Sequence, residues 1–258
     1  MNTISYHIKG ITTSLLQLAK GNYLVFFIPG AIITGIYWWL MQYTDSLQES
    51  YMLSSEYSWV NWTFGWFFDW ANSGTEKVFE ILDFLSRQVY IFIILTALSP
   101  FNTLLGEKLD GKFTGKTYKT SIVRFLNDLI RMIFVIFIAL LLEFTCIILY
   151  WLASKGLGLE VLDPLIYFCI SAFFFGFTFY DFAFERYSQG LFDTLTFAFY
   201  KPLTMLLTGT LFLAIYKIPI VGIPISPVIT VMVSTIVYLY ITKKLPKQNT
   251  ELNTQNDE

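Results

Sequence analysis

Two ionisable residues, Arg87 and Glu143, lie deepest within the long apolar stretches of this chain. Counted from the outer ends of the helices that these stretches predict, each lies roughly 13–15 Å down at 1.5 Å per residue. A lone charge at that depth is unfavourable, so we expect the two to pair, with Asp83 as a rival partner for Arg87. Such a pair is expected either in an ion path or in a structural contact that holds two helices together, and the sequence leaves both interpretations open.

A second group of charges lies where apolar runs end. Asp181 and Arg186 close one run, and Glu107 and Lys108 are expected at a similar level in the membrane. These four residues form either a cap and salt-bridge node or a charged gate at the mouth of a pore. Lys217, which lies at the tip of a predicted hairpin, either snorkels to the interface or offers its positive charge to an anion in the path.

The sequence contains no pattern typical of catalysis or cofactor binding. The motifs of serine hydrolases, P-loop nucleotide-binding proteins, zinc proteases and dinucleotide-binding folds are absent. The single histidine, His7, makes no metal-ligand cluster, and Cys146 and Cys169 lie in apolar runs as small packing residues. We therefore expect no enzyme activity, no cofactor and no metal site.

The composition indicates that these charges lie in a membrane. Of 258 residues, 55% are hydrophobic, and 26 Phe, 16 Tyr and 7 Trp contribute to a mean hydropathy of +0.57. A soluble domain of this size cannot bury so much apolar surface, so we predict an all-α integral membrane protein. The net charge of −2 is uninformative about partners, but no basic run suggests nucleic acid, so the expected partner is the lipid bilayer.

The apolar runs predict one helical membrane domain, residues 1–242, followed by a disordered cytoplasmic tail at 243–258. Residues 4–19 have the spacing of an amphipathic interfacial helix. Residues 44–77, which are acidic and rich in tryptophan, are expected to form an extracytoplasmic loop with an aromatic helix resting in the interface. The remaining long apolar runs predict membrane helices, the first of them either spanning or re-entrant, at residues 23–41, 78–105, 120–153 and 163–181.

A re-entrant hairpin is predicted at residues 202–241. Its two apolar arms, 203–216 and 228–241, are each shorter than the ~20 residues that a full span needs, and prolines and a glycine separate them. The densest lysine cluster of the chain falls at residues 108–119, which places that segment in the cytoplasm. The expected location is therefore the cytoplasmic (inner) membrane, with several spans and the N-terminus inside.

Several motifs resemble the CysZ-like membrane proteins, a family that includes the etoposide-induced protein 2.4 group. The resemblance extends over residues 4–242, in matching order and spacing. The aromatic-basic-glycine opening of the family corresponds here to Tyr6 to Gly10, and its P-F-N segment followed by a glutamate corresponds to Pro100-Phe101-Asn102 with Glu107. Its D-[YF]-x-x-x-R motif corresponds to Asp181, Phe182 and Arg186. Its two spaced prolines correspond to Ile218-Pro219 and Pro227.

The resemblance implies a helical fold of long transmembrane helices and membrane-dipping hairpins that forms a homo-oligomer. In bacterial members it implies sulfate uptake that feeds cysteine synthesis. We therefore expect a permease for sulfate or a related small oxyanion. A non-transporting membrane scaffold or assembly factor of the same fold is the alternative hypothesis, and a polar track through the protein would distinguish the permease from it.

The chain departs from the bacterial sulfate-permeating members at one anion-binding segment. Those members have a P-G-L-R-R-like segment whose arginines contact sulfate, whereas Tyr23 and Leu24 stand at the arginine positions here. Backbone N–H groups at a helix start can also hold an oxyanion. The candidate anion-binding residues of this divergent member are therefore Lys20, Gly21 and Asn22.

Overall fold

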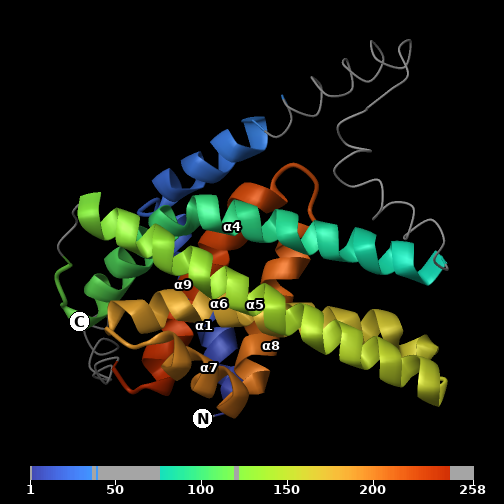
Figure 1. The fold of residues 1–258 in the computed structure, drawn as a ribbon. Coiled ribbons are helices and arrows are strands. Elements are labelled where there is room, and N and C mark those ends of the chain that lie inside the picture. The colour runs from blue at the N-terminus through green and yellow to red at the C-terminus, as the bar shows by residue number, and fades with distance from the viewer. Residues whose placement is uncertain (1, 37–38, 40–75, 119–121, 245–258) are drawn as a thin grey trace, which may run out of the picture.

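The computed structural model describes residues 2–36, 39, 76–118 and 122–244, and these form a helical bundle with no strand among them (Figure 1). Most of the predicted loop at 44–77 and of the tail at 243–258 lies outside the described residues. The helices follow in the order α1 (Thr3–Ala19), η1 (Leu24–Phe26), a helix over 27–36, α4 (Glu76–Thr114), α5 (Ile122–Leu157), η2 (Glu160–Leu162), α6 (Asp163–Arg186), α7 (Leu191–Tyr200), α8 (Pro202–Tyr216) and α9 (Gly222–Ile241).

Three of the described helical stretches are long and apolar enough to cross a membrane: Leu126–Leu157, Glu160–Arg186 and Gly222–Ile241. Two helix pairs meet the same criteria only when taken together, and they are bent by 101° (Thr3–Ala19 with Leu24–Ile36) and 98° (Leu191–Tyr200 with Pro202–Tyr216). The all-α class with candidate transmembrane helices is confirmed, whereas the membrane-dipping hairpins stay a prediction.

The hairpin at residues 202–241 has unequal arms. α8 has 15 residues, but α9 has 20, because it begins at Gly222 and continues through Pro227. The missing N–H of Pro224 is harmless in the first helical turn, where no intrahelical acceptor exists. The sequence predicted a helix starting only after Pro227, so that start was placed too late, and α9 alone has the length of a full span.

α6 packs so closely against α8 that glycines are required at the contact. A Cβ on Gly176 would lie 2.1 Å from the backbone oxygen of Met205, and one on Gly209 would lie 1.7 Å from that of Ala172. Small residues at such crossings let two helix backbones approach, which favours association inside a membrane. Nearly the whole second half of α6 is buried as a result.

α9 is the most buried of the candidate spans, with 78% of its apolar window inside the protein. α1 lies along it, and a Cβ on Gly10 would lie 2.9 Å from the side chain of Val237. α1 is tied further to α8, because His7 Nε2 and Thr208 Oγ1 are hydrogen-bonded at 3.0 Å. The helix at 27–36 also rests on α9, since a Cβ on Gly30 would meet the Cα of Pro224 at 2.6 Å.

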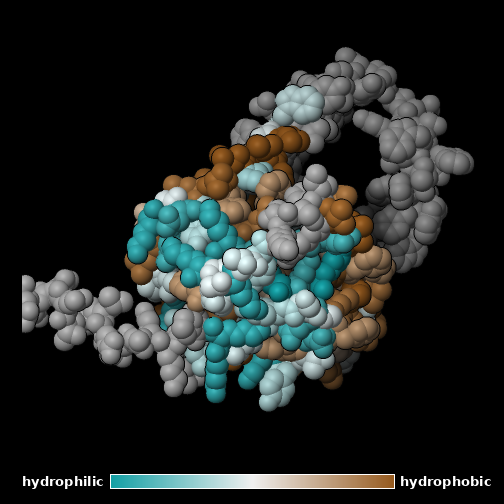
Figure 2. Space-filling view, turned by 90° about the vertical axis from the view of Figure 1, so that its left-hand side faces the viewer, coloured by the Kyte–Doolittle hydropathy of each residue, from teal (hydrophilic) through white to brown (hydrophobic). Residues whose placement is uncertain are grey.

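One end of the bundle is hydrophilic, and we call it the lysine-rich end after Lys108, Lys112, Lys116 and Lys244. It is the left-hand end in Figure 1, where the C-terminal end of α4 and the ends of α6 and α9 meet. Figure 2 views this end face on and shows hydrophilic residues gathered over its lower part, with hydrophobic surface at its borders. This distribution suits an end that leaves the membrane.

Candidate functional site

A line of buried polar side chains, which we call the polar seam, runs along one face of α4 towards the lysine-rich end. Its members recur every three or four residues, so they share one helix face over about 16 Å. All of them are buried where α4 packs against neighbouring helices, chiefly α5, α6 and α9. The polar seam consists of Ser99, Asn102, Thr103, Glu107 and Asp110.

Three of these side chains have atoms without a hydrogen-bond partner among the described residues. They are the hydroxyls of Ser99 and Thr103 and the amide nitrogen of Asn102. A buried polar group that lacks a partner costs about 1–3 kcal/mol, so protein cores contain few of them. Three on adjacent turns of one helix face call for a role other than packing, and their donors and acceptors are available to water or a polar solute.

Arg186, the last residue of α6, lies at the lysine-rich end of the polar seam. Its guanidinium is buried, and Nη2 donates to Thr235 Oγ1 of α9 at 2.8 Å. Gly106 of α4 makes room for it, because a Cβ there would lie 2.0 Å from Nη1. Nε and Nη1 have no hydrogen-bond partner among the described residues. The side chain thus presents unused donors beside the seam, with Asp110 and Glu107 near enough to balance its charge.

Asp181 belongs to a separate cluster. Arg131 of α5 donates to both carboxylate oxygens of Asp181, at 3.1 and 2.9 Å, and Thr194 of α7 donates to one of them at 2.9 Å. Arg131 also donates to the backbone oxygen of Gln189 at 3.1 Å. This cluster ties α5, α6 and α7 together, and the ion pair of Asp181 therefore runs to Arg131 instead of to Arg186.

Asp110 ends the polar seam and accepts hydrogen bonds from two phenols. Tyr118 donates to its Oδ2, and Tyr187 donates to its Oδ1 at 3.0 Å. Burial first, and Asp110 second, raise the pKa of both phenols above the usual 10, so both stay protonated as donors. Two ammonium groups lie over the Tyr187 ring, Lys244 at 3.2 Å and Lys116 at 3.9 Å from its centroid.

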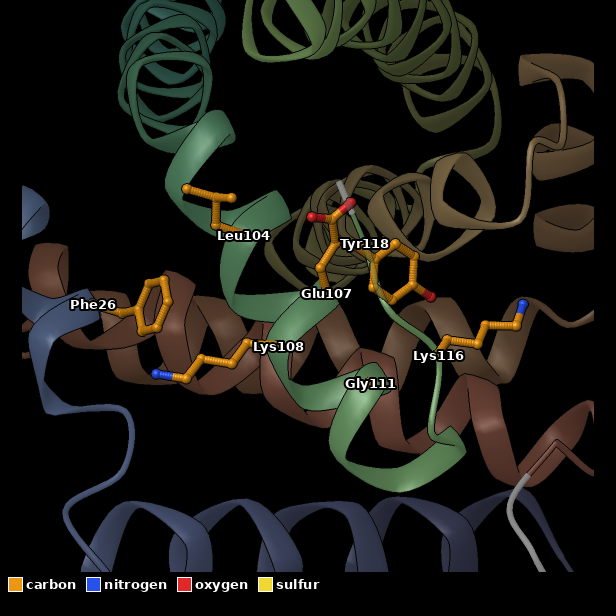
Figure 3. Close-up of a pocket in the computed structure, with 7 residues that line it drawn as sticks. All are labelled: Phe26, Leu104, Glu107, Lys108, Gly111, Lys116 and Tyr118. Carbon is orange, nitrogen blue, oxygen red and sulfur yellow. The ribbon is translucent and has the colours of Figure 1, made fainter. Parts of the chain in front are cut away.

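A cavity of about 490 Å³ opens at this point beside the last turns of α4. Its polar lining includes Glu107, Lys108, Lys116 and Tyr118, and Phe26 closes one side. Figure 3 shows Lys108 extending towards Phe26 on one side of α4, while Tyr118 and Lys116 lie on the other side and Glu107 points between them. Cations therefore flank the cavity, and one buried carboxylate lies within it.

The candidate anion-binding residues at 20–22 lie in the turn between the end of α1 and the start of the short helix η1, whose N-cap is Tyr23. Lys20 caps the C-terminus of α1, and Gly21 adopts φ +74° in the turn that follows. The C-terminal end of a helix carries partial negative charge, which disfavours an anion. Tyr23 is buried beneath the ammonium groups of Lys108 and Lys112, 5.8 and 5.9 Å from its ring centroid, whereas Leu24 is exposed.

The other candidate residues are dispersed. Lys217 is exposed at the C-cap of α8, about 30 Å along α9 from the lysine-rich end, with its ammonium 5.9 Å from the Phe168 ring centroid. Glu143 is fully buried in α5 and accepts a hydrogen bond from Ser171 Oγ of α6 at 2.8 Å. The side chain of Arg87 lies outside the described residues, so its pairing with Glu143 stays a prediction.

Of the predicted gate residues, Glu107 and Arg186 lie near each other beside the last turns of α4, whereas the Lys108 ammonium lies over the rings of Tyr23 and Phe26. Sequence reasoning missed Arg131 as the partner of Asp181, and it missed Asp110 and the hydroxyls of the polar seam. A signal was present, because polar residues at three- and four-residue spacing from Ser99 to Asp110 follow an apolar run. That spacing alone predicts a polar stripe on one face of α4.

Comparison with protein-family models, with curated proteins and with solved structures found no match for this chain.

Proposed function

We propose that the chain is a membrane permease for sulfate or a related small oxyanion, and a divergent member of the CysZ-like family. The observation that carries this proposal is the polar seam. Its hydroxyl and amide groups lie in line for about 6 Å, hold donors and acceptors that the described residues leave unused, and lead past Glu107 towards the guanidinium of Arg186. In a scaffold such side chains would be expected to form hydrogen bonds between helices, whereas the described residues leave these three without partners.

The chemistry at the end of the seam suits passage of an anion. Lys108 and Lys116 attract anions to the cavity, and field focusing at a charged mouth raises the local anion concentration. The described residues leave the Nε and Nη1 donors of Arg186 unused, and each can donate a charge-assisted hydrogen bond to an oxygen of an oxyanion. Glu107 weakens that attraction, which is consistent with transport, because an ion held too tightly cannot leave.

The proposed location is the cytoplasmic membrane of a bacterium. The lysine-rich end then faces the cytoplasm, following the usual bias of lysine and arginine, and α1 places the N-terminus on that side. We also propose a homo-oligomer, which the resemblance to the CysZ-like proteins implies.

The test is uptake of radiolabelled sulfate into liposomes that contain the purified protein, with selenite, thiosulfate and phosphate as competitors. The sharpest variant is Thr103→Val, because valine keeps the shape of threonine and removes its hydroxyl. We expect saturable uptake by the wild type and a several-fold slower rate for Thr103→Val, with thermal stability equal or higher because an unpartnered polar group is gone. Lys155→Gln, at the far end of α5, serves as the control and should transport normally.

The outcome that would overturn the permease is uptake no faster than that of empty liposomes, from protein shown to be folded and oligomeric. Normal transport by Thr103→Val would instead remove the seam from the path. The alternative function, a membrane scaffold, is favoured by one observation: the two arginine positions of the family hold a buried tyrosine and an exposed leucine. Absence of flux would therefore favour the scaffold.

A further inference from the structure

A second cavity lies beside the first, on the outside of the bundle. It has a volume of about 590 Å³ and is lined only by apolar side chains, from the helical segment at 24–36 and from α4. Val25, Ile28 and Ile32 line one wall, and Ala97 and Phe101 line the other. Phe26 borders both this apolar cavity and the polar cavity near Lys108, so the two are neighbours along one groove.

The groove follows a single face of α4. Ala97 and Phe101 line its apolar part, and Leu104, Lys108 and Gly111 line its polar part. These positions are spaced by four, three, four and three residues, so they form one stripe, on the opposite side of the helix from the polar seam. The stripe is about 21 Å long at 1.5 Å per residue.

That length and polarity match one leaflet of a membrane. A bilayer is about 40–45 Å thick including its headgroups, so one lipid measures about half of this along its axis. The apolar part of the groove lies deeper in the bundle, and the polar part lies towards the lysine-rich end. A phospholipid would therefore place an acyl chain between the helix at 27–36 and α4, and its headgroup beside Lys108.

The charges at the polar part select an anionic headgroup. The ammonium of Lys108 lies 5.8 Å from the ring centroids of both Tyr23 and Phe26, which fixes it at the junction of the two cavities. Lys112 lies over the same tyrosine and donates to Gln17 Oε1 at 2.6 Å. Basic side chains held by interfacial aromatic rings are a common arrangement for anionic lipid phosphates. Glu107 lies on the flank of the stripe, towards Tyr118 (Figure 3).

We propose that this groove is a binding site for one phospholipid with an anionic headgroup. The acyl chain occupies the apolar cavity, and Lys108, with Lys112 beside it, holds the phosphate. The headgroup end of this site shares Lys108 and the polar cavity with the mouth of the proposed anion path, whereas its acyl-chain end lies apart from the polar seam. A protein that transports nothing could still hold this lipid, and a permease could lack it.

The experiment is native mass spectrometry of the purified protein, incubated with phosphatidylglycerol or phosphatidylcholine of identical acyl chains. Ala97→Trp fills the groove, and because Ala97 is exposed the new side chain enters the groove without disturbing the core. Ile32→Trp fills it from the opposite wall. Lys108→Gln should weaken phosphatidylglycerol binding about fivefold, the effect of losing one surface lysine, and Lys155→Gln is the matched control.

We expect one phosphatidylglycerol bound to the wild type and to Lys155→Gln, weaker binding of phosphatidylcholine, and no bound lipid in either tryptophan variant of unchanged melting temperature. Equal binding of the two lipids, or lipid retained in both tryptophan variants, would overturn the proposal. Binding of inorganic phosphate without lipid would mean a free-anion site. If the tryptophan variants alter the oligomeric state and leave the lipid content unchanged, a second copy of the chain occupies the groove instead.

Discussion

The ion pair between Asp181 and Arg131 offers the most direct test of how this bundle holds together. The Asp181 side chain is 2% exposed and the Arg131 side chain 27% exposed, so solvent screens the pair only weakly. Asp181 accepts two hydrogen bonds from the guanidinium and a third from Thr194. Removing one partner of such a buried pair leaves a charge without compensation and typically costs about 3–5 kcal/mol.

We therefore expect Arg131→Gln to lower the free energy of unfolding by about 3–5 kcal/mol, and Asp181→Ala to lower it by less, because Asp128 and Glu185 still face Arg131. The double variant should lose about 1–3 kcal/mol less than the sum of the two, because the second substitution removes a group that the first has already isolated. The assay is reversible unfolding of the purified protein by sodium dodecyl sulfate in mixed micelles, followed by circular dichroism.

The exposed acid Glu160 supplies the control, since Glu160→Gln should change stability by less than about 0.5 kcal/mol. Single losses no larger than that of Glu160→Gln would show that the ion pair contributes nothing to folding. Losses that add within about 0.5 kcal/mol would show that the two residues act separately. Either result would refute the reasoning that places this pair at the junction of α5, α6 and α7.

Three further predictions follow from local geometry. Gly209→Val should abolish folding or lower the melting temperature steeply in detergent, because even a Cβ at this position would lie 1.7 Å from the backbone oxygen of Ala172 in α6. An unchanged melting temperature would contradict the close contact between α6 and α8. Ile220→Gly should stabilise the protein by about 1 kcal/mol in the same unfolding assay, because Ile220 has φ +67° in the turn before α9; no gain would mean that the turn holds no strain. Burial first, and Asp110 second, raise the pKa values of Tyr118 and Tyr187 in the folded protein. Because the folded protein holds these protons more tightly than the unfolded chain does, the resulting stabilisation is fully present below pH 10 and is lost as the pH rises above 10. Unfolding measured from pH 8 to 11 should show that loss, with a smaller slope in Tyr187→Phe; equal slopes in the variant and the wild type would exclude Tyr187 from it.

Hydropathy predicted most of the helices because long apolar runs have few alternatives in a membrane. The structure has helices at Thr3–Ala19, Ile122–Leu157 and Asp163–Arg186, close to the predicted ranges. The start of α9 was misplaced because prolines were taken to end the helix, although prolines near a helix start are tolerated. Helix ends depend on such local details, whereas the existence of a helix depends on a whole run.

The partners of the charged residues could not be predicted in the same way. Arg131 has one acidic neighbour at favourable spacing within its own helix, Asp128, and the sequence gives no reason to prefer Asp181, which is 50 residues away along the chain. That choice is made by the packing of α5 against α6, which turns Arg131 inwards. The need for glycine at position 106 could not be predicted from the sequence either, because it depends on the position of the Arg186 side chain, which leaves no room for a Cβ there.

The cations near Tyr23 affect how the absence of arginine at positions 23 and 24 is interpreted. The resemblance places two arginines at positions 23 and 24, and the chain has neither. Yet α4 brings the ammonium groups of Lys108 and Lys112 to within 5.9 Å of the Tyr23 ring, so positive charge returns to the same place from another helix. Because an anion responds to the field and not to which helix carries the charge, an altered motif at residues 20–24 does not by itself argue against anion binding. The choice between the proposed permease and the scaffold therefore rests on the transport measurements with the polar-seam variants.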